Sequence, residues 1–348
     1  MDHQQWSLRI DSAVIICALL LRLWAGGLFD PVVSFLSQPR VLSFLTYLET
    51  GQHVQFPADS APLEVFALEL PQTEPETQPQ LQPETVPADP WQIPVFSPAD
   101  GENIEFKYGC KLRPDAAELI TQPLNWDLTG TKPRVLILHT HTTEAYTPTP
   151  DTQYEQEAAF RTLDEAYNMV AVGDRVAQLL EEAGIGVIHD QEIHDYPSYN
   201  GSYNHARKAV AEYLEEYPEI LLVLDLHRDA SGSNTSQMRP TVTVNGQTAA
   251  QLMLVVGTNA GGLTHPNWEE NLALGLKLHR QLQRIAPGIC RPLNLRAQRF
   301  NQDQSPGALL IEVGAAGNTQ QEALLAAELL AKAVIQLSQG ATTAGSTS

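Results

Sequence analysis

Basic residues are missing from a long stretch of this chain. No Lys or Arg lies between Arg40 and Lys107, whereas eleven Asp and Glu residues fall there. The whole chain of 348 residues carries a formal net charge of -20. Because nucleic-acid binding depends on cations that face the phosphates, this charge argues against nucleic acid as a partner. The acidic stretch itself is typical of a solvated linker.

Cysteine is also scarce. Cys17, Cys110 and Cys290 lie far apart, and no C-x-x-C pair occurs. The spacing therefore indicates neither a disulfide framework nor a cysteine zinc site. Cys110 and Cys290 could pair outside the cytoplasm, and their spacing alone leaves that question open.

Long apolar runs are few, and the one at 12–29 stands out near the N-terminus. About 18 apolar residues are close to the minimum for a helix that crosses a bilayer. No convincing small-residue cleavage site follows, so residues 1–30 are predicted to be a short tail and a retained single-pass anchor. Residues 31–102 are predicted to be a juxtamembrane segment and a disordered linker, because 55–98 are rich in Pro, Gln and Glu.

Globular patterning begins at about residue 103 and continues to 339, where a small, polar and disordered tail is predicted for 340–348. Short β-branched runs alternate with segments of helical periodicity, which predicts an α/β fold of three αβα layers around a mostly parallel sheet. The predicted helices cover 168–183, 205–217, 268–285 and 319–336. The predicted strands cover 135–138, 185–188, 220–226 and 308–313, with a hairpin of 240–244 and 252–256 around Asn245-Gly246.

Polar side chains follow three of the predicted strands. His139, His141 and Glu144 come after the first strand, His227 comes after 220–226, and Glu312 comes after 308–311. In open α/β sheets, ligands bind beyond the carboxyl ends of the strands. Two imidazoles and a carboxylate are the ligands of a catalytic zinc, and a further carboxylate can move the proton of its water. The pattern therefore predicts a hydrolytic metal site.

The spacing leaves the choice of histidine open. Along a strand, His139 and His141 would point to the same face, so both could line the site. One is expected to bind the metal, and the other to position the substrate or to support a metal ligand.

Five sequence blocks follow one another in order: HTHTTEAY at 139–146, GVIHD at 186–190, HDYPSYNGSY at 194–203, LDLHRDA at 224–230 and FNQDQSPGALLIEVG at 300–314. Together they resemble the stage II sporulation protein P family. Members of that family are membrane-anchored peptidoglycan hydrolases of endospore-forming bacteria, related to zinc-dependent N-acetylmuramoyl-L-alanine amidases. The resemblance covers about 132–337.

The resemblance implies a zinc-bound catalytic site and a cell-wall substrate. The reaction would cleave the amide between the lactyl group of N-acetylmuramic acid and the first L-alanine of the stem peptide, and the family also implies cleavage of peptide cross-bridges. The implied partners are the stage II sporulation proteins D and M, and the implied process is engulfment. Because peptidoglycan lies outside the cytoplasmic membrane, the domain at 103–339 would face outward from the cell membrane.

Carried over by position, His227 matches the second histidine ligand of the amidases and Glu312 their catalytic glutamate. The first histidine falls on His139 or His141. The carboxylate ligand usually opens the helix after the first strand, which leaves Asp164 and Glu165 as competitors of Glu144. Glu144 is preferred because it stands beside both histidines.

Three further residues are candidates for substrate binding. Tyr199 and Asn200 lie in a Tyr-, Asn- and Ser-rich block that offers stacking faces and hydrogen bonds. Arg228 either clamps a stem-peptide carboxylate or forms an ion pair with Asp229 that braces the loop. Two alternatives to the amidase function stay open: another metal-dependent wall hydrolase, such as a carboxypeptidase or deacetylase, and a non-catalytic scaffold that binds peptidoglycan.

Overall fold

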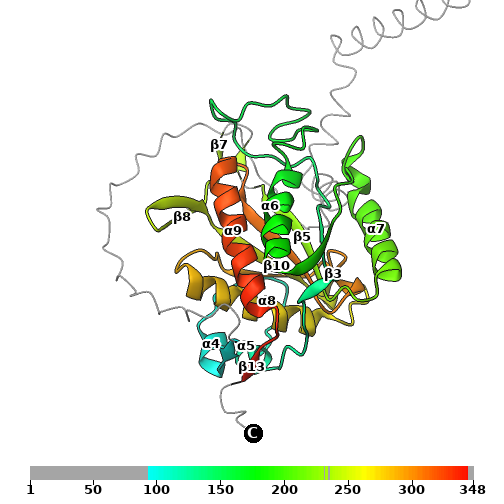
Figure 1. The fold of residues 1–348 in the computed structure, drawn as a ribbon, viewed down its shortest axis with the longest axis vertical. Coiled ribbons are helices and arrows are strands. Elements are labelled where there is room, and N and C mark those ends of the chain that lie inside the picture. The colour runs from blue at the N-terminus through cyan, green and yellow to red at the C-terminus, as the bar shows by residue number, and fades with distance from the viewer. Residues whose placement is uncertain (1–92, 231, 234–235, 344–348) are drawn as a thin grey trace, which may run out of the picture. The chain divides into compact units, whose positions relative to one another are not determined.

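The computed structural model describes residues 93–230, 232–233 and 236–343 (Figure 1). The predicted anchor, the juxtamembrane segment and most of the predicted linker lie outside these residues. Within the described part of the chain, no helix is both long enough and apolar enough to span a membrane.

A sheet of seven strands forms the centre of the fold, in the order β2-β11-β10-β12-β5-β3-β4. Each neighbouring pair is parallel except β10 and β12, so the predicted mostly parallel α/β sheet is confirmed. The strands are β2 (Phe106–Gly109), β3 (Gly130–Leu138), β4 (Ile185–His189), β5 (Leu222–Asp229), β10 (Leu252–Gly257), β11 (Leu293–Arg296) and β12 (Ala308–Ala315).

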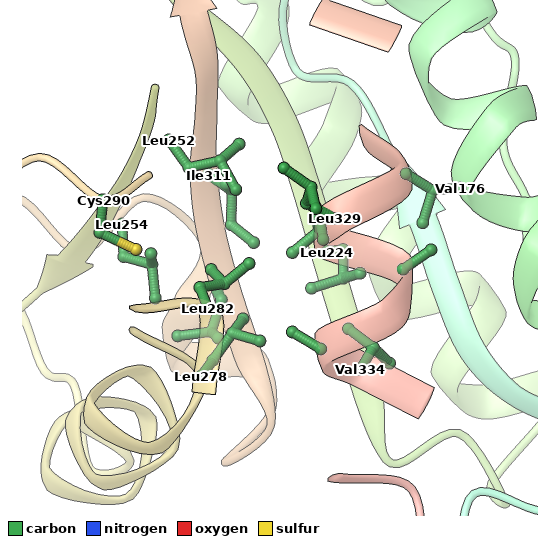
Figure 2. Close-up of a cluster of buried hydrophobic side chains, with 14 of the residues drawn as sticks. Val176, Leu224, Leu252, Leu254, Leu278, Leu282, Cys290, Ile311, Leu329 and Val334 are labelled. Atoms are coloured by element: carbon green, nitrogen blue, oxygen red, sulfur yellow. The ribbon is translucent and has the colours of Figure 1, made fainter. Parts of the chain in front are cut away.

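Helices cover both faces of this sheet. On one face lie α6 (Met169–Glu182), α8 (Trp268–Ile285) and α9 (Gln320–Leu337), which share a core with the sheet. Figure 2 shows Val176 of α6, Leu282 of α8 and Leu329 of α9 in one cluster with Leu224 and Ile311 of the sheet. On the other face, α7 (Ser202–Glu216) packs through Ala206 and Val210 against β3 and β5.

The helix ends follow local capping chemistry. The Asn168 side chain accepts a hydrogen bond from the Val170 N–H at 2.9 Å, which starts α6 one residue after its cap. Thr319 and Glu322 form a reciprocal capping box at the start of α9. The predicted helices at 168–183, 268–285 and 319–336 are therefore confirmed to within one residue at each end, whereas α7 begins three residues before the predicted 205.

The predicted hairpin turn is right, but its second strand is wrong. Asn245 and Gly246 both have positive φ, as a two-residue hairpin loop requires, and they join β8 (Thr241–Val244) to β9 (Gln247–Ala250). A loop of this length pairs Val244 directly with Gln247, so the second strand starts at once. The segment 252–256 instead forms β10, a fully buried strand in the middle of the main sheet.

The globular unit extends beyond both predicted boundaries. β1 (Val95–Phe96) pairs with β13 (Thr342–Thr343), and α4 (Pro98–Glu102) follows β1. Phe96 is fully buried. The predicted domain start at 103 is therefore too late, and the prediction of a disordered tail is wrong for 340–343; residues 344–348 lie outside the described part. The remaining short elements are α5 (Ala116–Ile120), β6 (Gly232–Ser233), β7 (Ser236–Gln237) and 3-10 turns at Tyr199–Gly201, Asn259–Gly261 and Gln302–Gln304.

Candidate active site

The sheet brings the candidate residues together at neighbouring strands. In the parallel pair of β5 and β12, His227 lies directly opposite Glu312. Both strands continue past these residues, to Asp229 and Ala315. His227 and Glu312 therefore lie within strands, a few residues before the carboxyl ends, whereas the sequence placed them at or just past those ends. Strand alternation places Asp225 on the same face as His227. The site therefore lies on the face of the sheet that α7 covers.

His141, Glu144 and His227 gather in this region. The rings of His141 and His227 meet edge to face with centroids 5.3 Å apart. The Glu144 Oε2 atom lies 3.6 Å from the His227 Nδ1 atom. All three side chains are buried, and the buried His141 Nδ1 atom has no hydrogen-bond partner among the described residues.

His139 lies apart from this group. Its Nδ1–H donates to the Leu226 carbonyl oxygen at 3.0 Å, and its Nε2 atom lies 2.9 Å from the His189 Nε2 atom. Burial and the neighbouring His189 lower the pKa of His139 to about 3, so its ring is neutral. The expectation that His139 and His141 share a strand face is wrong, because β3 ends at Leu138 and the chain turns immediately afterwards.

Glu144 is held by two arginines. Its Oε1 atom lies 3.1 Å from the Arg161 Nη2 atom and 3.4 Å from the Arg228 Nη1 atom, while the Arg228 backbone N–H donates to Oε2 at 3.1 Å. Burial would raise the pKa of Glu144, but Arg228, His227 and Arg161 outweigh it and hold the pKa well below its ordinary value. Its competitors, Asp164 and Glu165, are exposed in the turn before α6.

Arg228 is not open to a substrate. Its side chain is 3% exposed, its Nε–H donates to the Ala145 carbonyl oxygen at 3.0 Å, and its Nη2 group donates to the Phe160 carbonyl oxygen at 2.9 Å. Among the described residues, Asp229 forms its ion pair with Arg291, at 2.8 Å, and no ion pair with Arg228. The geometry thus favours a bracing role for Arg228, with partners other than the predicted Asp229.

Glu312 presents a carboxyl group that is set up for proton transfer. Its Oε2 atom is buried and has no hydrogen-bond partner among the described residues. Burial raises the pKa of Glu312 to about 8, although the nearby His227 lowers it. A carboxyl group whose pKa lies near neutrality can both accept and donate a proton under working conditions.

Three polar residues near the site, Asp225, Arg161 and Asp195, were not predicted from the sequence. Asp225 lies 2.9 Å from the His227 Nε2 atom, and the Thr140 N–H donates to the same carboxylate at 2.8 Å. Arg161 links Glu144 to Asp195 through a 2.6 Å ion pair with Asp195. The alternation of β5, which puts residues two apart on one face, was the available signal for Asp225. Arg161 and Asp195 carried no comparable signal, because each lies in an irregular loop.

Aromatic side chains form the wall beside His141. Tyr199, which is 46% exposed, stacks on the His141 ring at a centroid distance of 4.5 Å, and the Arg161 guanidinium lies 4.7 Å from the Tyr199 ring. Tyr203 meets His141 edge to face at 5.6 Å. Asn200 follows Tyr199 in the same 3-10 turn and is exposed. Tyr199 and Asn200 therefore lie where a bound ligand can reach them.

The donor set suits a zinc ion. His141 and His227 offer imidazole nitrogens, and Glu144 offers a carboxylate. The buried His141 Nδ1 atom makes no hydrogen bond with the residues that the structure describes. The ligand atoms of His141, Glu144 and His227 do not, however, all lie within 4.8 Å of one another. Within the described ranges, the group of three possible ligands whose atoms lie within 4.8 Å of one another is Asp190, Glu192 and His194. In that group the His194 Nε2–H already donates to Asp190 at 3.0 Å.

The family model of Stage II sporulation protein P (SpoIIP) matches residues 69–335, which is most of the chain. This chain belongs to the stage II sporulation protein P family. Stage II sporulation protein P of Bacillus subtilis (strain 168) is 29% identical over 214 residues. That match covers 58% of this chain and 50% of the relative, so this family member spans about half the length of the curated relative. The predicted resemblance is confirmed.

Solved structures of amidases also align with this family member. N-acetylmuramoyl-L-alanine amidase AmiC2 of Nostoc punctiforme aligns with a TM-score of 0.37 and 12% identity, over 60% of this chain and 99% of that one. The CwlD amidase from Clostridioides difficile, in complex with the GerS lipoprotein, aligns with a TM-score of 0.34 and 13% identity. That alignment covers 59% of this chain and 94% of the amidase chain. Similarity of this size carries no argument about activity, so family membership rests on the sequence match.

Proposed function

We propose that this member of the stage II sporulation protein P family is a zinc-dependent peptidoglycan hydrolase. It acts as an N-acetylmuramoyl-L-alanine amidase, with the endopeptidase activity that the family implies, during engulfment in endospore formation. The observation that carries the proposal is the pairing of His227 with Glu312 across two parallel strands, beside His141 and Glu144. Family membership supports the cell-wall substrate.

His141, Glu144 and His227 are the residues that would hold the zinc. When bound, zinc lowers the pKa of a coordinated water and polarises a carbonyl group. Arg161 and Arg228 keep Glu144 ionised, which a carboxylate ligand requires. Asp225 lies 2.9 Å from the Nε2 atom of His227, and its carboxylate would orient that ring.

Glu312 is the general base and then the general acid. It removes a proton from the attacking water as the water oxygen bonds to the amide carbon. When the carbon–nitrogen bond breaks, the electron pair goes to nitrogen, and Glu312 returns the proton to the leaving amine. The products are a carboxylic acid and a free amine, and Glu312 ends in its starting state.

Tyr199 and Asn200 are the proposed substrate contacts. Tyr199 exposes about half of its ring, and its position against His141 suits stacking on a sugar ring or packing on a stem peptide. Arg228 is not among the proposed contacts, because its donors face the backbone of the chain itself.

The location and partners of the protein follow from its proposed role. Peptidoglycan lies outside the cytoplasmic membrane, so the globular unit is placed on that side, with residues 1–30 as a single-pass anchor in the cell membrane. The stage II sporulation proteins D and M are the proposed partners. Support for these statements comes from the composition of the first hundred residues and from the family, because residues 1–92 lie outside the described part.

The substitution Glu312→Gln tests this proposal. It keeps the size of the side chain and removes its ability to accept the water proton, so hydrolysis of purified peptidoglycan should fall by about 100-fold or more. Sedimentation with the wall should not change. Undiminished turnover would remove Glu312 from the reaction, and a wild-type chain that binds the wall without cleaving it would favour a scaffold.

A further inference from the structure

Two threonines flank His141 in the turn that follows β3, and each donates two hydrogen bonds to one buried aspartate. Thr140 donates its N–H at 2.8 Å and its hydroxyl at 2.6 Å to the two carboxylate oxygens of Asp225. Thr143 donates its N–H at 3.1 Å and its hydroxyl at 2.7 Å to the two oxygens of Asp195. These two Asp–Thr pairs fix the backbone on both sides of a proposed metal ligand.

The first pair joins the two proposed histidine ligands. Asp225 lies on β5, two residues before His227, and its Oδ1 atom is 2.9 Å from the His227 Nε2 atom. The same oxygen accepts the N–H of Thr140, the residue next to His141. One carboxylate therefore contacts both the ring of His227 and the turn that carries His141.

The second pair joins His141 to the proposed carboxylate ligand, Glu144. The Asp195 Oδ2 atom accepts from the Arg161 Nη1 group at 2.6 Å, and the Arg161 Nη2 group donates to the Glu144 Oε1 atom at 3.1 Å. The Asp195 Oδ2 atom also lies 3.9 Å from the His141 Nδ1 atom. Because Glu144 directly follows Thr143, Asp195 restrains Glu144 both through the backbone and through Arg161.

The need to satisfy buried N–H groups accounts for only part of this arrangement, because a backbone carbonyl oxygen is enough for that purpose. Thr142, in the same turn, shows such a simpler case: its hydroxyl faces the carbonyl oxygens of His139 and Glu192, at 2.8 Å each. Burying a carboxylate is costly unless hydrogen-bond donors compensate it. Asp195 and Asp225 receive their donors from residues that carry, adjoin or hold the proposed metal ligands.

We propose that Asp195 and Asp225 are positioning residues, which hold the turn at 140–144 in the conformation that binds zinc. In this role neither aspartate contacts the reacting atoms, and each acts through the threonine that donates to it. Without one of the pairs, the turn would have to be ordered when the metal binds, and that cost would lower the affinity for zinc. This inference rests on the proposed zinc-dependent hydrolase function.

The test measures the zinc affinity of the full chain by competition with a chromophoric chelator. Thr143→Val keeps the shape of the side chain and removes its hydroxyl donor, whereas Thr143→Ser keeps the donor. Thr140→Val and Thr140→Ser treat the other pair in the same way. We expect each valine variant to bind zinc about 10-fold to 100-fold more weakly than the wild type, and each serine variant to recover most of that loss.

Thr258→Val is the matched control. Thr258 is 1% exposed, and its hydroxyl donates to the Arg296 carbonyl oxygen at 2.8 Å. It follows β10, which runs antiparallel to β12, so it lies at the opposite end of the strands from the candidate site. This variant also loses a buried hydroxyl and should lose thermal stability, but it should keep the zinc affinity of the wild type.

Wild-type zinc affinity in both Thr140→Val and Thr143→Val would overturn the inference. Equal losses in the valine and serine variants, or an equal loss in Thr258→Val, would assign the effect to packing and overturn it as well.

Asp195→Asn supplies a second variant if a valine variant does not fold. Its amide offers one acceptor atom where the carboxylate offers two, so it should also bind zinc more weakly, and unchanged affinity would overturn the inference. A wild-type chain that binds no zinc would instead contradict the proposed function itself, so the two failures are distinguishable.

Discussion

Glu144 is the most constrained side chain of the candidate site. Three positively charged or donating groups from Arg161 and Arg228 face its two oxygens, and Arg161 in turn is held by Asp195. Removing one partner of such a buried network leaves an uncompensated charge, which costs more than the pair contributes. The arginines therefore keep one carboxylate ionised and oriented beside His227.

The roles of His139 and His141, the two histidines after β3, can be distinguished by substitution. His141→Gln should abolish binding of one zinc equivalent, because the His141 ring lies beside His227 and its buried Nδ1 atom makes no hydrogen bond within the described part of the chain. His139→Gln should keep that zinc, because both ring nitrogens of His139 contact other groups. Competition with a chromophoric chelator measures both affinities, and loss of zinc from His139→Gln alone would reverse the assignment.

Residue positions near strands could be predicted from the sequence, whereas those in loops could not. Apolar runs that ended in His227 and Glu312 indicated two side chains that the structure places opposite each other. The competition between His139 and His141 was unresolved because it depends on where β3 stops, and Leu138 is followed by residues without a clear turn signal. Arg161 and Asp195 meet only through tertiary packing, and their sequence separation gave no indication of it.

Helix α6 contains a glycine, Gly173, although glycine is unfavourable in the interior of a helix. Gly173 lies in the middle of α6, where glycine costs about 1 kcal/mol relative to alanine. A Cβ atom there would lie less than 3.0 Å from the Nε2 atoms of both His139 and His189. The absence of a side chain at Gly173 allows the paired histidines to pack against the helix.

The substitution Gly173→Ala should therefore destabilise the fold, by about 1–3 kcal/mol, despite the better helix propensity of alanine. Urea unfolding followed by circular dichroism measures the change. Gly275→Ala in α8 is the matched control, because its new methyl group meets movable side-chain ends at 3.3 Å and 3.5 Å. A Gly173→Ala protein as stable as the Gly275→Ala protein would contradict the packing argument.

Elements with a strong local signal were predicted well. Capping side chains and apolar periodicity were enough for α6, α8 and α9. The prediction of the hairpin was only half right. The Asn245-Gly246 turn was predicted correctly, but the run at 252–256 was taken as the second strand because it is more hydrophobic than the true partner, Gln247–Ala250. Burial in the central sheet, and not pairing across the turn, decided where that run belongs.

At the scale of the whole molecule, the two ends of the described chain meet. β1 pairs with β13, Phe96 is fully buried, and Asp100 contacts Arg280 at 2.6 Å and Arg284 at 3.0 Å on α8. The sequence did not indicate this, because these residues directly follow a Pro-rich acidic segment and share its composition. Only the contact with α8 identifies them as part of the globular unit.

Deleting residues 1–102 should consequently destabilise the protein more than deleting residues 1–92. Loss of a buried aromatic side chain alone costs about 3–5 kcal/mol, so the shorter chain should unfold at least about 5 °C lower. Thermal unfolding of the two truncated chains, measured side by side in one buffer, gives the comparison. Equal midpoints would mean that β1 and α4 contribute nothing to the fold.

The proposed metal-dependent hydrolysis of the cell wall can be tested on the whole protein. The most direct measurement combines zinc content with mass-resolved product analysis, on the full chain incubated with purified peptidoglycan, with and without a chelator. We expect about one zinc per chain and chelator-sensitive release of free stem peptides from intact glycan strands. A metal-free chain that sediments with the wall and releases nothing would contradict it.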